Sequence, residues 1–107
     1  MRYIGKIEHD YYLKEHDVKI VVFGAGGMVN VILEQLKREG LWNKLVCICD
    51  NTPQNCAEFI KGIRVVGFGQ ACHGYKDSEF VVYNKYATEM AEQLIDKDIT
   101  NIHYIRI

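Results

Sequence analysis

The strongest constraint on how this chain folds is a glycine-rich segment that joins an apolar run to an amphipathic pattern. Five of the six residues from Val18 to Phe23 are apolar, and they lead directly into Gly24-Ala25-Gly26-Gly27. A continuous apolar run of this length is typical of a strand buried on both faces of a sheet. Apolar residues then recur at positions 29, 32, 33 and 36, which is the spacing of one helix face. The segment therefore predicts a strand, a tight turn and a helix.

Glycines at such a turn let the backbone reverse tightly and leave the first N–H groups of the helix open to an anion. Gly24 and Gly26 match the start of the G-x-G-x-x-G fingerprint of dinucleotide-binding domains, whereas Val29 stands where the third glycine would be. The two glycines therefore suit a phosphate site, but a bare turn that binds nothing would have the same sequence.

The rest of the chain alternates between strand and helix patterns. We expect strands over 19–23, 45–49, 63–66, 79–83 and 101–107, the last at an edge, and helices over 27–39 and 85–96. This alternation predicts an α/β fold in which helices cover both faces of a parallel sheet. With right-handed crossovers it becomes a three-layer, Rossmann-like, doubly wound parallel sheet of about five strands in the order 3-2-1-4-5.

Two regions are expected along the chain. Residues 1–17 are predicted to form a helical extension, with a short amphipathic helix over 6–15, and residues 18–107 to form the Rossmann-like nucleotide-binding domain. A chain of 107 residues is near the commonest domain size.

Ligands of doubly wound sheets bind at the carboxyl ends of the strands, where the strand order reverses. The candidate binding residues at these ends are Gly24, Ala25, Gly26, Gly27 and Met28, then Asp50 and Asn51, then Gly67 and Phe68, and finally Asn84. Asp50 lies 24 residues beyond Gly26, close to the spacing of the acid that binds ribose hydroxyls. We also expect Asn84 to cap the helix that follows it.

Composition excludes several partners. The net charge is −1 with acidic and basic residues interspersed, so nothing favours nucleic acid or an anionic membrane surface. No apolar run approaches the roughly 20 residues of a membrane span. The first residues do not resemble a signal peptide, so a cytoplasmic location is expected.

The four cysteines do not have the spacing of a zinc site. Cys47 and Cys49 alternate within a predicted strand and so share one face, while Cys56 and Cys72 stand apart. We expect Cys47 and Cys49 to be buried, reduced and without a metal.

Three motifs together resemble a known domain. They are Val-Val-Phe-Gly-Ala-Gly-Gly-Met-Val-Asn, Cys-Ile-Cys-Asp-Asn and Ile-Lys-Gly-Ile-Arg-Val-Val-Gly. Over residues 19–107 the chain is similar to the N-terminal Rossmann-like domain of bacterial nucleotide-sugar acyltransferases, which also accompanies glycosyl- and methyltransferases of surface-polysaccharide synthesis. The resemblance implies that the chain binds the nucleotide part of a UDP-sugar. Gly24, Gly26 and Gly27 would then meet phosphate, and Asp50 would face the ribose or base.

The residues do not decide whether the cofactor is a UDP-sugar or NAD(P). No catalytic triad or metal motif is present, and the acyltransferase hexapeptide repeats are missing, so we expect binding without catalysis by this chain alone. One alternative is the NAD(P)-binding domain of an oxidoreductase, with His73 or Lys85 as the proton donor. Another is a structural or oligomerisation module without a ligand. A homo-oligomer, or further domains of a larger chain, would be compatible with each of these.

Overall fold

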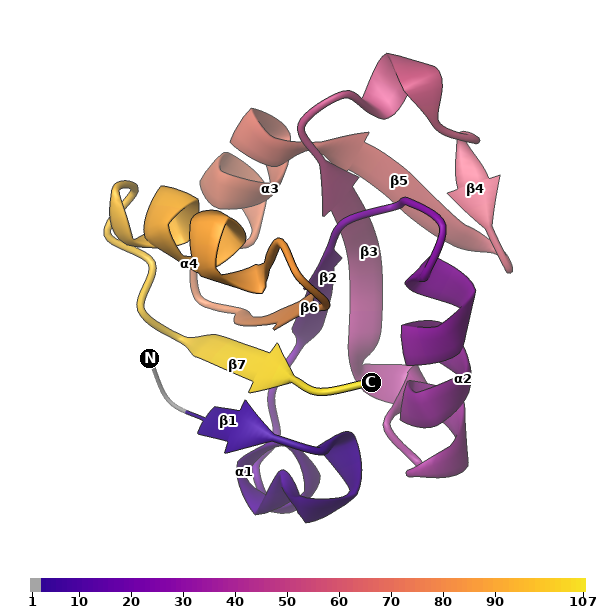
Figure 1. Cartoon of the computed structure of the whole chain (residues 1–107), viewed down its shortest axis with the longest axis vertical. Coiled ribbons are helices and arrows are strands. Elements are labelled where there is room, and N and C mark those ends of the chain that lie inside the picture. The colour runs from indigo at the N-terminus through magenta and orange to yellow at the C-terminus, as the bar shows by residue number, and fades with distance from the viewer. Residues whose placement is uncertain (1–2) are drawn as a thin grey trace.

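In the computed structural model, which describes residues 3–107, the chain folds into one twisted sheet with helices on both faces (Figure 1). The sheet has seven strands within these residues, in the order β1-β7-β6-β2-β3-β5-β4. Six of these strands run parallel to one another, and only β4 is antiparallel to the strand beside it, β5. The bounds are β1 (Tyr3–Gly5), β2 (Ile20–Phe23), β3 (Leu45–Asp50), β4 (Phe59–Ile60), β5 (Ile63–Gly67), β6 (Glu79–Tyr83) and β7 (Ile102–Ile105).

The α/β class is confirmed, but the expectation of about five strands is wrong, and the order of the whole sheet differs accordingly. Two short strands that the sequence did not predict, β1 and β4, flank the others. A tight hairpin turn at Lys61 and Gly62 joins β4 to the antiparallel strand β5. Both turn residues have the positive φ that such a turn requires, 51° and 81°. Strand β7 is not at the edge, because β1 pairs with it. Strands of two or three residues are too short for their periodicity to be recognised.

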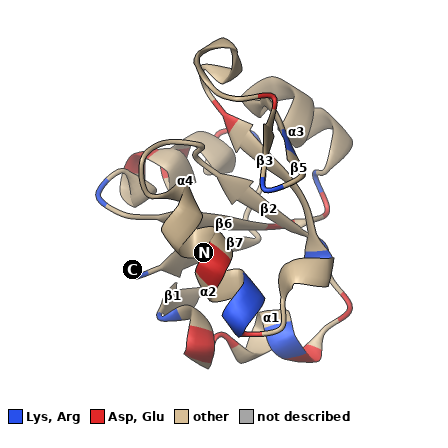
Figure 2. Cartoon of the chain, turned by 90° about the vertical axis from the view of Figure 1, so that its right-hand side faces the viewer, with Lys and Arg blue, Asp and Glu red and all other residues tan. Residues whose placement is uncertain are grey.

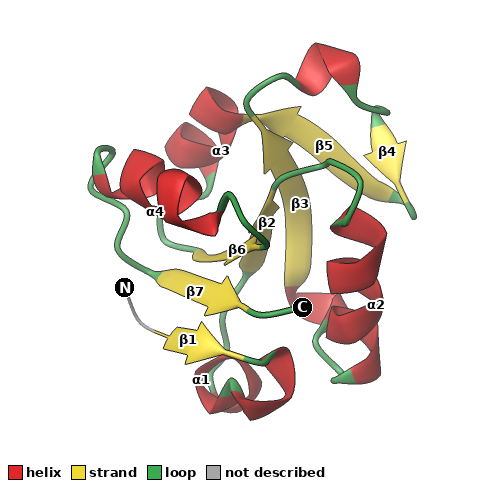
Figure 3. Cartoon of the chain, in the orientation of Figure 1, coloured by secondary structure: helices red, strands yellow, loops and turns green. Residues whose placement is uncertain are grey.

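Helices form a layer on each side of this sheet (Figure 3). On one face, α1 (Tyr11–Glu15) and α2 (Val29–Arg38) bury Leu13, Ile32 and Leu36 in a common apolar cluster. On the other face, a second cluster contains residues of α3 (Phe68–Gly74) and α4 (Ala87–Ile95). Three short 3-10 helices complete the chain: η1 (Ile7–His9), η2 (Trp42–Lys44) and η3 (Pro53–Asn55).

The apolar run at β2 is buried on both faces, as predicted. Ile20 and Val22 belong to the cluster under α1 and α2, whereas Val21 and Phe23 belong to the cluster under α3 and α4. Helix α2 begins at Val29, two residues later than predicted, because Gly26 and Gly27 belong to the turn that precedes it.

The predicted helix over 6–15 is divided into η1 and α1, and residues 1 and 2 of the expected extension lie outside the described residues. The division falls at Asp10, whose buried carboxylate accepts a hydrogen bond from the N–H of Leu13 and caps α1. The other carboxylate oxygen lies 2.6 Å from Nδ1 of His103, and Nε2 of the same ring lies 2.8 Å from Glu79. The N-terminal segment thus adds β1 to the sheet and a buried polar contact beneath it.

Cys47 and Cys49 are buried on the α3 and α4 side, as predicted. Burial raises the pKa of Cys47 to about 11 and raises that of Cys49 as well, so both thiols stay protonated. Among residues 3–107, no helix is long and apolar enough to cross a bilayer. Acidic and basic residues both occur along the ribbon (Figure 2).

Candidate functional site

The reversal of strand order falls between β2 and β6. From β2 the chain passes to β3 and β5 on one side, and then crosses to β6 and β7 on the other. The carboxyl ends of β2 and β6 therefore border the crevice in which doubly wound sheets bind ligands. The glycine turn leaves β2 at this point (Figure 1).

Gly24 ties the turn to the strands on both sides. Its N–H donates to the carbonyl of Cys49 at 2.7 Å, and its carbonyl accepts the hydroxyl of Tyr83 at 2.7 Å. The φ of Gly24 is 114°, a conformation that side chains rarely adopt, and an added Cβ would lie 3.3 Å from the Tyr83 hydroxyl oxygen. The conformation and surroundings of this position therefore favour glycine for structural reasons.

Gly26 and Gly27 are glycines for a different reason. An added Cβ at either position would meet no protein atom within 4 Å, so their small size leaves open space beside the backbone. Within residues 3–107, the N–H groups of Gly26, Gly27 and Met28 have no hydrogen-bond acceptor. They lie at the N-terminal end of α2, which is the positive end of the helix dipole, and therefore suit an anion.

Asp50 lies against the same turn. Its Oδ2 accepts the N–H of Ala25 at 2.8 Å, and its Oδ1 accepts the N–H and the hydroxyl of Thr52 at 2.9 and 3.1 Å. Partial burial alone would raise the pKa of Asp50, but the hydrogen bonds from Ala25 and Thr52 outweigh it and hold the pKa below its ordinary value. One carboxylate oxygen can accept two hydrogen bonds, so a donor such as a ribose hydroxyl can bind Oδ2 beside the N–H of Ala25.

These groups border a pocket of about 240 Å³, lined by Gly24, Gly26, Gly27, Met28 and Asp50 together with Tyr83, Asn84, Tyr86 and Met90. Six of these nine residues were predicted as site residues. Tyr83, Tyr86 and Met90 were not, because in the sequence they are indistinguishable from core residues of a strand and a helix. The one available signal was the position of Tyr83 as the last residue of a strand, next to the predicted crevice.

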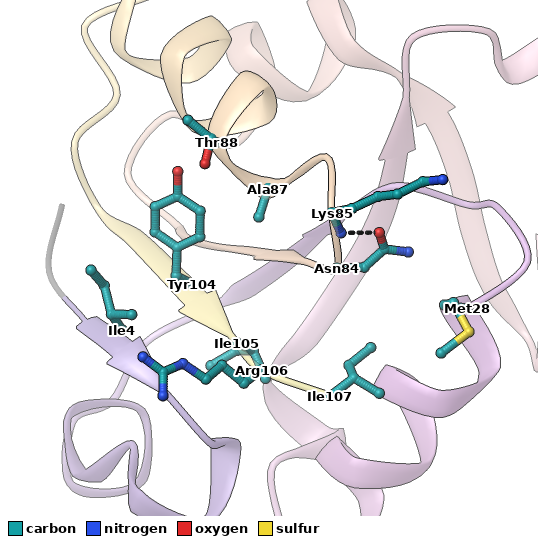
Figure 4. Close-up of a pocket in the computed structure, with 10 residues that line it drawn as sticks. All are labelled: Ile4, Met28, Asn84, Lys85, Ala87, Thr88, Tyr104, Ile105, Arg106 and Ile107. Carbon is teal, nitrogen blue, oxygen red and sulfur yellow. Dashed lines mark hydrogen bonds between the residues drawn. The ribbon is translucent and has the colours of Figure 1, made fainter.

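A larger groove of about 690 Å³ lies beside this pocket (Figure 4). Met28 and Asn84 line both. The groove extends over the ends of β6, β7 and β1, and its further lining residues are Ile4, Lys85, Ala87, Thr88, Tyr104, Ile105, Arg106 and Ile107.

Four predicted site residues do not line the pocket or the groove: Ala25, Asn51, Gly67 and Phe68. Ala25 lies in the glycine turn and donates its N–H to Asp50. Asn51 exchanges two hydrogen bonds with Gln93 of α4, at 3.1 and 2.6 Å. Gly67 precedes α3, and the ring of Phe68 stacks on Phe23 with centroids 5.0 Å apart. Asn51, Gly67 and Phe68 lie at strand ends as expected, but packing and side-chain pairing occupy them.

Asn84 lines the pocket without capping α4. It adopts a positive φ of 68°, and its side-chain oxygen accepts the N–H of Lys85, while the N-cap position of α4 falls at Tyr86. A left-handed residue between a strand and a helix is one that asparagine tolerates well. The capping prediction is therefore wrong.

The two proton-donor candidates lie in different places. Lys85 lines the larger groove, with Nζ 5.2 Å from the ring centroid of Tyr86. His73 lies instead in a hollow with Val18, Lys19 and Ser78, at the amino ends of β2 and β6. His73 therefore lies near the amino ends of the strands, whereas the glycine turn lies at their carboxyl ends.

No protein-family model matches this sequence, and no curated protein is found to be similar to it.

Proposed function

We propose that this chain binds a nucleotide, with the diphosphate on the glycine turn and the ribose at Asp50. One observation carries the proposal: the carboxylate of Asp50 accepts the N–H of Ala25, directly beside the open N–H groups of Gly26, Gly27 and Met28. N–H groups that can bind an anion thus lie next to a carboxylate that can accept a hydrogen bond from a hydroxyl, at the reversal of strand order. A phosphate and a ribose are the two neighbouring groups that would use them.

A nucleotide-sugar is the preferred ligand. The similarity of the three sequence motifs to nucleotide-sugar-binding domains supports this choice, as does the presence of a second, larger groove next to the pocket. Lys85 borders that groove and would add a positive charge near the diphosphate. We propose a binding role within a sugar-modifying system rather than catalysis by this chain alone.

The test is a ligand screen that compares the native chain with two glycine variants. Native protein should be stabilised against heat by at least one of the UDP-, GDP- and dTDP-sugars, by about 2.7 kcal/mol at 100 times the dissociation constant. Gly26→Val should lose this binding, because its side chain would occupy the path of the phosphate. Gly69→Val is the matched control, since an added Cβ there also meets no atom within 4 Å and Gly69 lies in α3, away from the turn.

The readouts are the melting temperature and calorimetric titration, with circular dichroism as the check of folding. If folded Gly26→Val binds as tightly as the native chain, the ligand is not at this turn. If no nucleotide binds the native chain, the leading function becomes a structural or oligomerisation module.

NAD is the second candidate ligand, and Asp50 is the observation that favours it. A carboxylate accepts the 2′-hydroxyl of the adenosine ribose but repels the 2′-phosphate of NADP. The same screen should therefore rank NAD above NADP, and tighter binding of NADP would contradict the position assigned to Asp50. Reduction of the nicotinamide with a sugar substrate would distinguish an oxidoreductase from a binding domain.

A further inference from the structure

We propose that the larger groove binds the non-nucleotide half of the ligand, and that Arg106 selects a carboxylate on that half. This inference rests on the proposed nucleotide binding and narrows it to acidic nucleotide-sugars, such as nucleotide-linked uronic acids. Neither the sequence motifs nor the glycine turn carries this information, because Arg106 follows the last strand of the sheet.

The sizes of the two cavities support the first part. The pocket at the glycine turn has a volume of about 240 Å³, below the roughly 300–1,000 Å³ of sites that enclose small molecules. The groove of about 690 Å³ lies within that range. Since Met28 and Asn84 line both, a ligand whose phosphates bind the turn would continue past these two residues into the groove.

The lining of the groove suits a sugar with a charged substituent. Ile105 and Ile107 provide apolar contacts for the face of a ring, while Thr88 and Tyr104 provide hydroxyl groups. In Figure 4 the hydroxyl of Tyr104 points toward Thr88, on the side of the groove bordered by α4. A small number of polar groups on an otherwise apolar wall is the common composition of a specific binding site.

Arg106 supplies the charge. Its backbone is held in place because its N–H donates a hydrogen bond of 2.8 Å to the carbonyl of Gly5 in β1. Among residues 3–107, its guanidinium has no hydrogen bond or ion pair. In Figure 4 it lies near Ile4, at the far end of the groove from Met28. A group bound there would be separated from the diphosphate by the body of the ligand.

A carboxylate fits this end better than a second phosphate. The planar fork of a guanidinium binds a carboxylate through two parallel hydrogen bonds, and one positive charge balances it. The other cation of the groove, Lys85, extends away from Arg106 in Figure 4, and its ammonium lies over Tyr86. A single guanidinium therefore faces the far end, which matches a single negative charge.

The experiment compares ligands that differ only in the acid group. Dissociation constants for UDP-glucose and UDP-glucuronate, and for GDP-mannose and GDP-mannuronate, are measured with the native chain, Arg106→Gln and the control Arg64→Gln. Arg64 is also exposed but lies on β5, outside the groove. We expect the native chain and Arg64→Gln to bind one uronate at least about tenfold more tightly than its neutral partner. Arg106→Gln should lose that preference while keeping its affinity for the neutral sugar.

The outcomes separate this inference from the function on which it rests. If the native chain binds both members of a pair equally, and Gly26→Val binds neither, nucleotide binding stands and the carboxylate site is wrong. If a uronate is preferred but Arg106→Gln keeps that preference, the assignment to Arg106 is wrong. Binding of NAD without any nucleotide-sugar overturns the inference, and binding of none of these ligands overturns both proposals.

Discussion

At the scale of single residues, the glycine turn combines two different uses of glycine within three positions. Gly24 holds a φ of 114° between two strands, and its carbonyl accepts the Tyr83 hydroxyl. Gly26 has no such conformational demand and no neighbour for a Cβ to meet. The first glycine therefore belongs to the stability of the sheet, and the second is free to serve a ligand.

Replacing Gly24 should lower the stability of the protein, whereas replacing Gly27 should not. Gly24→Ala forces a side chain into a disfavoured φ and against the Tyr83 hydroxyl, so we expect a loss of about 1–3 kcal/mol in the free energy of unfolding. Gly27→Ala is the control, because its Cβ would lie in open space. Urea denaturation measures both, and equal stability of the two variants would contradict the role given to Gly24.

Asp50 should link ligand binding to pH in the acid range. Its pKa is held below the ordinary value by the hydrogen bonds it accepts, so its contribution to stability is present above the unfolded pKa of about 3.9. That contribution is lost as the pH falls through the lower, folded pKa. Asp50→Ala should remove this part of the acid dependence and weaken nucleotide binding by about 1–3 kcal/mol. Urea denaturation between pH 2 and 6 and titration of the best ligand are the measurements. An unchanged acid profile in Asp50→Ala would contradict this.

The sequence predicted the positions of some of these site residues but not of others. The proximity of Asp50 to the turn followed from its spacing after Gly26, because parallel neighbouring strands bring their carboxyl ends together. Tyr83 could not be recognised, since its ring is buried like any core residue and only its hydroxyl reaches Gly24. Asn51 and Phe68 sit where strand-end residues were expected, but a local side-chain pair and a ring stack determine what they contact.

At the scale of elements, the N-terminal segment is attached to the sheet by polar contacts as well as by strand pairing. Strand β1 pairs with β7, and Nζ of Lys44 donates to the carbonyls of Leu13 and His16 at the end of α1, at 2.6 and 2.8 Å. Beneath α1, His103 of β7 lies between the buried carboxylates of Asp10 and Glu79. None of these contacts is visible in the local sequence, because each joins residues far apart in the chain. Helix and strand periodicity therefore identified α2 and β2 but missed β1.

The contact between His103 and the two carboxylates should make the attachment of this segment sensitive to pH. Burial lowers the pKa of His103, but hydrogen bonds and charge from Asp10 and Glu79 outweigh it, so the pKa is raised. A raised pKa means that the contribution to stability is fully present below the unfolded value of about 6.5. It is lost as the pH rises through the higher, folded pKa.

His103→Gln should therefore destabilise the protein most at low pH. Removing one partner of a buried charged pair costs about 3–5 kcal/mol, because the carboxylates stay buried without their counter-ion. The difference in unfolding free energy between the native chain and the variant should narrow as the pH rises above 6.5. Urea denaturation from pH 5 to 9 measures it, with His73→Gln as an exposed control. A difference that stays constant over this range would contradict a charged His103.

At the scale of the whole molecule, the reversal of strand order brings three separate parts of the chain to one crevice. The turn after β2, the end of β3 and the segment between β6 and α4 are distant in sequence, yet all border the pocket. The larger groove adds the ends of β7 and β1. A single ligand placed as we propose would therefore contact both halves of the sheet, and the extra strand β1 would take part in binding through Ile4.

Binding should consequently protect these distant segments together. With the best nucleotide-sugar at saturation, we expect slower amide hydrogen exchange over residues 24–29, 50–52 and 84–88, because the ligand would contact their N–H groups or hold their loops. Exchange at the β4–β5 hairpin and in α3 should not change, since neither lines the pocket or the groove. Protection confined to residues 24–29 would mean that the ligand stops at the glycine turn. Protection over α3 alone would place it elsewhere, because the carboxyl ends of β2 and β6 would then have no part in binding.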